Sequence, residues 1–102
     1  MIANPARGEA ALELSGHILR LRPSFGALAV AEAEVGPLFA FVEQAASGKA
    51  GLEQIIALLW HCIADRPADL RREVFAEAVI AIGLVKLTPI LASLLKQILA
   101  GR

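Results

Sequence analysis

The sequence predicts a mostly helical α+β fold, in which about five short helices pack on an N-terminal β-hairpin. Residues 9–22 alternate between apolar and polar side chains around a two-residue turn, as a half-buried hairpin does. From residue 24 onward, apolar side chains instead recur at helical spacing between proline-containing breaks. A length of 102 residues suits one domain, so we expect residues 1–102 to form a single unit. The hairpin occupies about 9–22 and the helical part about 24–100.

The register of the hairpin follows from its turn. Ser15-Gly16 suits a two-residue turn, and this places Leu12 opposite Leu19 on one face of the ribbon. On the other face the same register pairs Glu9 with Arg22. Because an isolated two-stranded ribbon is marginally stable in water, we expect its leucine face to lie against helices.

The first helix is predicted at 24–35. Pro23 ends the second strand because it has no N–H for a ladder, and Ser24 stands at the N-cap position. We expect the carboxylates of Glu32 and Glu34 to point outward. The inward face is expected to carry Phe25, Leu28, Ala29 and Val35.

Four more helices are expected after this one. Gly36-Pro37 ends the first helix and begins a second that runs to about residue 46. The stretch 52–64 is apolar nearly all round and is predicted to be the central helix. A long helix then begins at residue 68 or 69, runs to about 85, and carries a stripe of Leu70, Val74, Ala78, Ala81 and Ile82. The last helix begins at Thr88-Pro89 and ends at Gly101.

The composition indicates exposed apolar surface. Apolar residues make up 57% of the chain, above the ~45–50% typical of a globular domain. One Trp and four Phe are the only aromatic residues, so the surplus is aliphatic. A small domain has too little interior to bury all of it. We therefore expect apolar patches of the kind that contact partner proteins.

Charge and targeting signals exclude several classes of partner. Ten basic and ten acidic residues balance, so nothing attracts nucleic acid or an anionic membrane. The single Cys62 forms no internal disulfide, which fits a reducing cytosol. The N-terminal residues lack the apolar core of a signal peptide. The longest apolar stretch, 78–95, is interrupted by Lys86 and Pro89 and is too short to span a bilayer. We expect a cytoplasmic protein.

No set of residues predicts catalysis or metal binding. His61 and Cys62 are neighbours whose side chains point ~100° apart on a helix, so they do not form a nucleophile–base pair. His61 and Asp65 share a helix face, but two ligands without a third make a poor metal site. Glu73 and Glu77 also share a face, which a solvated charged surface explains. We predict no enzyme activity, no cofactor and no metal.

Phosphate binding is also disfavoured. The glycines of 47–51 lack the spacing of a phosphate-binding loop. Arg7, Arg20 and Arg22 carry the charge to contact phosphates, but no aromatic stacking platform accompanies them. A solvent-facing hairpin edge explains these arginines better.

The last helix is the candidate binding element. It carries six large aliphatic side chains in ten residues, more than one face packed on a core requires. Either the helix closes the bundle, or it offers an apolar surface for self-association or for a partner helix. Trp60 and the pair Phe39 and Phe41 are more typical of a core. The candidate partner-binding residues are Ile90, Leu91, Leu94, Leu95, Ile98 and Leu99.

The chain resembles the small gene transfer agent family proteins, which belong with phage tail assembly chaperones. The resemblance extends from about Asn4 to Trp60 and rests on the order and spacing of short segments. These are Asn4-Pro5-Ala6-Arg7-Gly8-Glu9, the Gly16 turn, Leu21-Arg22-Pro23-Ser24-Phe25-Gly26-Ala27-Leu28, Glu32-Ala33-Glu34 and Gly36.

The resemblance implies a non-enzymatic role in tail assembly in the cytoplasm of a bacterial host cell. Such chaperones bind the tape measure protein, or another tail protein, and keep its hydrophobic helices soluble. The family also carries a tail tube label, which implies a structural component that forms homo-oligomers. A tube subunit needs long strands, and one short hairpin is visible here, so we favour the chaperone role.

Overall fold

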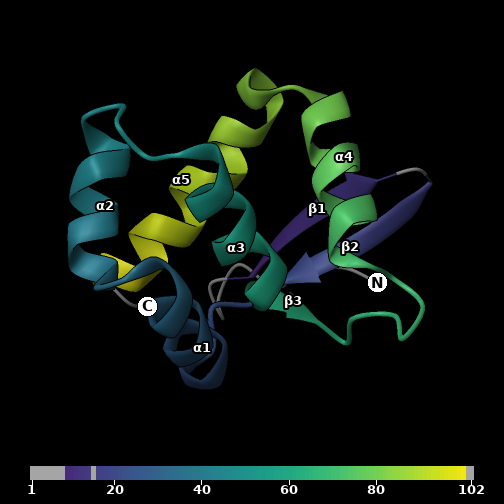
Figure 1. The fold of residues 1–102 in the computed structure, drawn as a ribbon, viewed down its shortest axis with the longest axis horizontal. Helices are drawn as coiled ribbons and strands as arrows, with labels where there is room; N and C mark the ends of the chain where they lie inside the picture. The colour runs from purple at the N-terminus through teal and green to yellow at the C-terminus, as the bar shows by residue number, and fades with distance from the viewer. Residues whose placement is uncertain (1–8, 15, 101–102) are drawn as a thin grey trace.

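The structure is a computed structural model that describes residues 9–14 and 16–100. It confirms a mostly helical fold with an N-terminal hairpin, and Figure 1 shows the sheet on one side of α3 with α1 and α2 on the other. Ser15 and Gly101, to which the sequence assigned a turn and a helix end, lie outside the described residues. Arg7, for which phosphate binding was disfavoured, lies outside them as well. The elements are β1 (Ala10–Leu14), β2 (His17–Leu21), α1 (Phe25–Val35), α2 (Leu38–Ala46), α3 (Leu52–Cys62), β3 (Ile63–Ala64), α4 (Arg72–Ile82) and α5 (Leu84–Ala100).

The hairpin has the predicted register, but the sheet has a third strand. Leu12 pairs with Leu19, as the two-residue turn requires. β3 then pairs antiparallel with β2, giving the order β1-β2-β3 in place of the predicted two-stranded ribbon. β3 was not predicted, because its two residues continue the apolar run of the helix before it and were assigned to that helix.

The expected pair of Glu9 and Arg22 is absent, because the ladder ends at Ala10 and Leu21. The Glu9 carboxylate lies instead 4.0 Å from Nε of Arg20. The Arg22 backbone N–H donates to the Cys62 carbonyl at 2.7 Å, which ties the end of β2 to the end of α3.

α1 begins as predicted, but only part of its predicted inward face is buried: Leu28 packs against the core and Val35 is partly buried. The Ser24 hydroxyl accepts from the Ala27 N–H at 3.2 Å and caps the helix. Phe25, expected inside, is 90% exposed, and Ala29 is exposed too, whereas Ala31 is fully buried. α1 carries apolar side chains on all sides, so its contact with α3 selects the buried face. The spacing of apolar residues in the sequence could not indicate which side of α1 would be buried.

The last two helices differ in their bounds from the prediction. α4 begins at Arg72, later than expected, and ends at Ile82 because Gly83 takes a φ of 96°, which glycine tolerates. α5 begins at Leu84 and so includes Pro89 in its second turn, where the sequence predicted a start. The Thr88 hydroxyl donates to the Leu84 carbonyl at 2.9 Å within this first part of the helix.

The buried face of α4 is shifted from the predicted one. Phe75 and Val79 are fully buried, one position along from the predicted Val74 and Ala78. Val74 is 46% exposed and Ala81 is exposed. The other predicted residues, Leu70, Ala78 and Ile82, are partly buried and pack against the core, so the stripe lies beside the centre of the buried face.

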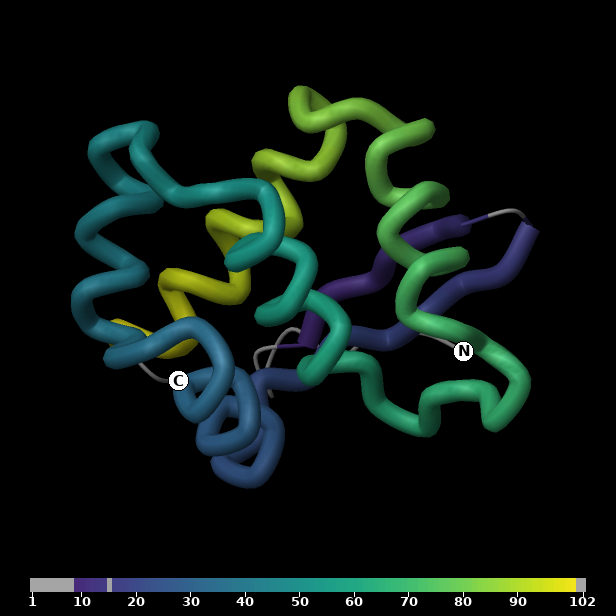
Figure 2. Tube along the Cα trace, viewed as in Figure 1, coloured from purple at the N-terminus to yellow at the C-terminus, as the bar shows by residue number. Residues whose placement is uncertain are grey.

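One cluster of buried side chains joins the sheet to the helices. α4 and α5 both contact β1, and α4 runs beside the hairpin in Figure 2. The core is drawn from all three strands and all five helices, with Phe41 from α2 and Ala31 from α1. Its fully buried large members include Leu12, Leu21, Leu58, Leu59, Phe75, Val79, Leu87 and Leu94.

Within residues 9–14 and 16–100, no single helix is both long and apolar enough to cross a membrane. The consecutive pairs α1–α2 and α4–α5 reach that length and composition only together, and they bend by 77° and 112° at their breaks.

The contrast between two phenylalanines tests this fold. Phe75→Ala should lower the free energy of unfolding by about 3–5 kcal/mol, because it empties a fully buried site beside Trp60. Phe25→Ala, the matched control, should change it by about 0.5 kcal/mol or less, because that ring is 90% exposed. Urea denaturation followed by circular dichroism measures both. Equal losses for the two variants would contradict the placement of Phe25.

Candidate interaction surface

The six predicted partner-binding residues of α5 divide into three groups. Leu94 is fully buried and belongs to the core. Leu99 is 60% exposed. The other four are partly buried and pack against the core: Ile90, Leu91, Leu95 and Ile98. The helix therefore closes the bundle with one side and leaves Leu99 and the outer parts of these four side chains accessible.

The first turns of α5 border a shallow apolar hollow. Leu84, Leu87 and Leu91 line one side of it, and the segment from Ala45 to Ile55 lines the other. Its volume is about 210 Å³, and Thr88 supplies the only side-chain hydroxyl among its lining residues. Leu91 is thus placed at an accessible apolar site, together with Leu84, which the sequence did not single out.

Exposed apolar side chains also occur on every other helix and on the hairpin. Val85 and Phe25 are the most exposed, at 87% and 90%. The apolar composition predicted surplus apolar surface, but the sequence pattern located this surface only on the last helix. The ten exposed large apolar side chains of the described residues are Ile18, Phe25, Val30, Phe39, Leu52, Val74, Ile80, Leu84, Val85 and Leu99.

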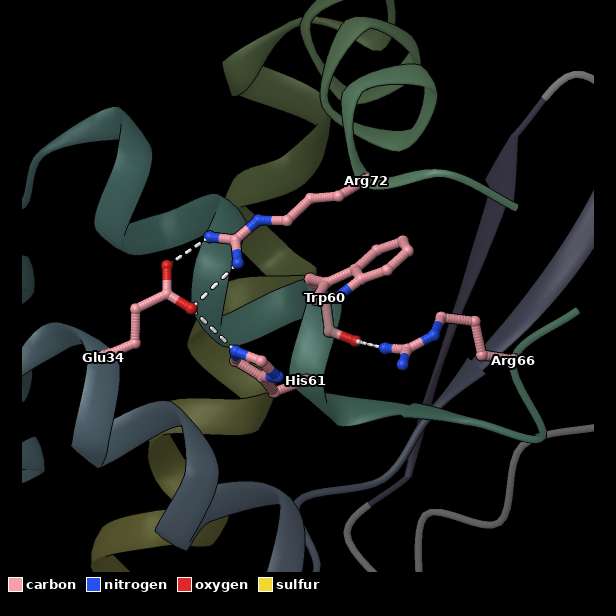
Figure 3. Close-up of polar contacts among 5 residues, drawn as sticks. All are labelled: Glu34, Trp60, His61, Arg66 and Arg72. Atoms are coloured by element: carbon pink, nitrogen blue, oxygen red, sulfur yellow. Dashed lines mark hydrogen bonds and ion pairs between the residues drawn. The ribbon is translucent and has the colours of Figure 1, made fainter. Parts of the chain in front are cut away.

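A polar cluster joins three helices beside this surface. Glu34 extends from the last turn of α1 toward Arg72 and His61 (Figure 3). It accepts from Nη1 of Arg72 at 2.8 Å, contacts Nη2 as well, and lies 2.8 Å from Nε2 of His61. The hydrogen bonds from Arg72 and then His61 lower the pKa of Glu34 to about 2. The predicted outward-facing carboxylate is therefore a link between α1, α3 and α4.

Trp60 occupies the space between the polar cluster and the core. Its ring lies 5.5 Å from that of Phe75, and the Arg66 guanidinium lies 4.1 Å from the Trp60 ring centre. Arg66 also donates to the Trp60 carbonyl at 3.3 Å (Figure 3). Trp60 thus packs against the core on one side and supports a surface cation on the other.

The structure separates the residues that had the spacing of a catalytic or metal site. Cys62 is buried in the core, and burial raises the pKa of its thiol to about 12. His61 instead contacts Glu34 at the surface, and Asp65 accepts from Arg20 at 2.8 Å. Glu73 and Glu77 are both exposed. In the described parts of the chain, no three His, Cys, Asp or Glu residues form a group that could hold a metal ion.

No curated protein and no solved structure matches the chain. A family model described as a phage tail tube protein, GTA-gp10, matches residues 7–101. The match extends beyond the resemblance noted in the sequence, which ended near Trp60, and it includes the helices that form the exposed apolar surface.

The ion pair of Glu34 predicts a pH dependence. The folded-state pKa lies below the ordinary value of 4.5, so the stabilisation is complete above about pH 5 and is lost as the pH falls toward 2. Glu34→Gln should lower the free energy of unfolding at pH 7 by about 1 kcal/mol or less, because solvent screens this part-exposed pair. The deficit should shrink between pH 4.5 and 2, measured by urea denaturation. A deficit independent of pH would contradict an ionic role for Glu34.

The burial of Cys62 predicts an inert thiol. A disulfide reagent at pH 7 should label native protein at least about 1,000-fold more slowly than protein in urea, because only the unfolded fraction exposes the thiol. Spectrophotometric release of the thiolate leaving group measures both rates. Rapid labelling of the native protein would show that Cys62 is accessible.

Proposed function

This chain belongs to the GTA-gp10 phage tail tube protein family, and we propose that it acts as a tail assembly chaperone that binds hydrophobic helical segments of the tape measure protein. Its family gives it a role related to the tail of a phage or gene transfer agent. Partners among the other tail proteins follow from such a role. The chaperone activity and the tape measure protein as its partner are the steps that we add.

The exposed apolar surface is the observation that carries this proposal. Within residues 9–14 and 16–100, ten large apolar side chains lie exposed, and nine of them are spread over all five helices. Exposed apolar groups on a small protein favour contact with a partner. A chaperone that covers hydrophobic helices needs many such side chains on several faces, because its client presents a long succession of apolar stripes.

The cysteine, histidine and carboxylate positions support a non-enzymatic role. The Cys62 thiol is buried, and the Glu34 carboxylate is engaged by Arg72 and His61. These groups stabilise the fold where they stand. We infer that the protein acts by binding alone, in the cytoplasm of the bacterial host cell while particles assemble.

The second candidate function is a structural component of the tail tube. Two observations favour it: the description of the family, and the position of β1 at the edge of the sheet. An edge strand can pair with a strand of a neighbouring subunit and so build a ring. The strands weigh against it, because β1 and β2 have five residues each and β3 has two, which gives a small sheet for a ring of subunits.

Co-expression with the tape measure protein of the same gene cluster tests the proposal. We expect the tape measure protein to be soluble only when this chain is present, and the two proteins to elute together in size-exclusion chromatography. An unrelated small helical protein expressed at the same level serves as the control. If the chain forms rings visible by electron microscopy and leaves the tape measure protein insoluble, the tube role replaces the chaperone role.

A further inference from the structure

An open groove of about 490 Å³ lies between α3 and α4. The two helices contact each other and lie side by side in Figure 1. Arg72, at the start of α4, and His61, at the end of α3, both reach Glu34, so the helices run in opposite directions (Figure 3). A groove between two antiparallel helices has the shape that accepts a third helix.

The floor of the groove is apolar along its length. Leu52 and Ile80 are 41% and 49% exposed, so both offer apolar surface to an occupant of the groove. The other two apolar lining residues are Ile56, which is buried, and Ala76, which is partly buried. The groove can therefore contact the apolar side chains of an occupant.

The rim of the groove carries net negative charge. Glu34 and Arg72 neutralise each other in their ion pair. Glu53 and Glu73 add two more carboxylates, one from the first turn of each helix, and neither is among the ion pairs of the described residues. Glu53 acts on Arg72 through its charge alone. No lysine lines the groove. An occupant that places cations beside these two carboxylates would meet a complementary charge.

We propose that this groove binds an amphipathic α-helix of a partner tail protein, with its apolar stripe on the floor and Lys or Arg side chains beside Glu53 and Glu73. The inference rests on the proposed function, because it names the surface and the chemistry by which the chaperone would recognise its client. It predicts that client helices with basic flanks bind more tightly than equally apolar helices with acidic flanks.

Two synthetic helices test the groove directly. One is an amphipathic peptide of roughly 18 residues with a leucine stripe flanked by Lys, and the other has Glu in place of every Lys. Fluorescence anisotropy should show that the wild-type protein prefers the Lys peptide by about tenfold, and that added NaCl reduces this preference. The double variant Glu53→Lys, Glu73→Lys should prefer the Glu peptide. The double variant Leu52→Asp, Ile80→Asp should bind both peptides at least about tenfold more weakly than a wild-type groove binds its preferred one.

Matched controls separate the groove from general charge. Glu13→Lys, Glu43→Lys makes the same change of charge at exposed carboxylates on β1 and α2, outside the groove, and should keep the preference for the Lys peptide. Val85→Asp, at an 87% exposed site outside the groove, is the control for the apolar floor. Circular dichroism verifies that each variant folds. If a groove variant fails to fold, the inference is tested on the wild-type protein, whose preference for the Lys peptide should fall as NaCl is added.

Several outcomes would overturn the inference. They are equal binding of the two peptides by the wild-type protein, an inverted preference in the control variant, or a homodimer that disappears in the groove variants, which would make a second copy the occupant. Co-expression with the tape measure protein distinguishes a failure of the groove proposal from a failure of the proposed chaperone function. If groove variants still solubilise the tape measure protein, the chaperone role stands without this groove. If the wild-type protein binds the Lys peptide but not the tape measure protein, the groove stands and the proposed client is wrong.

Discussion

The structure depends on the burial of one face of the hairpin. Leu12, Leu19 and Leu21 lie on the same side of the sheet, and all three are buried. A two-stranded ribbon has no interior of its own, so this face must be covered before the strands are stable. α4 and α5 contact β1 and provide that cover, and side chains of α3 complete the core. The opposite face stays in water, with Ile18 53% exposed.

α3 connects this sheet to the rest of the molecule. Its chain becomes β3 directly after Cys62, so the end of the helix is fixed by pairing with β2 and by the hydrogen bond from the Arg22 N–H. That position orients Trp60 toward Phe75 of α4 and His61 toward Glu34 of α1. A short apolar helix thus determines where α1 and α4 lie, and the space that remains beside α4 is the groove with its acidic rim.

The high apolar content is divided between a small core and an extensive surface. The core needs few large side chains, because the domain is small. The remaining aliphatic and aromatic residues face solvent on all five helices, at a cost in solubility that a binding role explains. The family match places this surface in a tail protein. Its exposed apolar groups are distributed over the hairpin and all five helices rather than gathered on one element.

The sequence by itself determined the features that neighbouring residues control. The register of Leu12 and Leu19, the cap at Ser24 and the break at Gly36-Pro37 all follow from contacts or patterns within a few residues. The family resemblance follows from the order and spacing of short segments along the chain. The tertiary structure decided the rest. β3 forms only because β2 offers a partner from 42 or more positions away, and Phe25 faces water because α3 selects another face of α1. An evenly apolar helix has no preferred inward side until a distant element packs on it. The location of the exposed apolar surface therefore could not be predicted from the sequence.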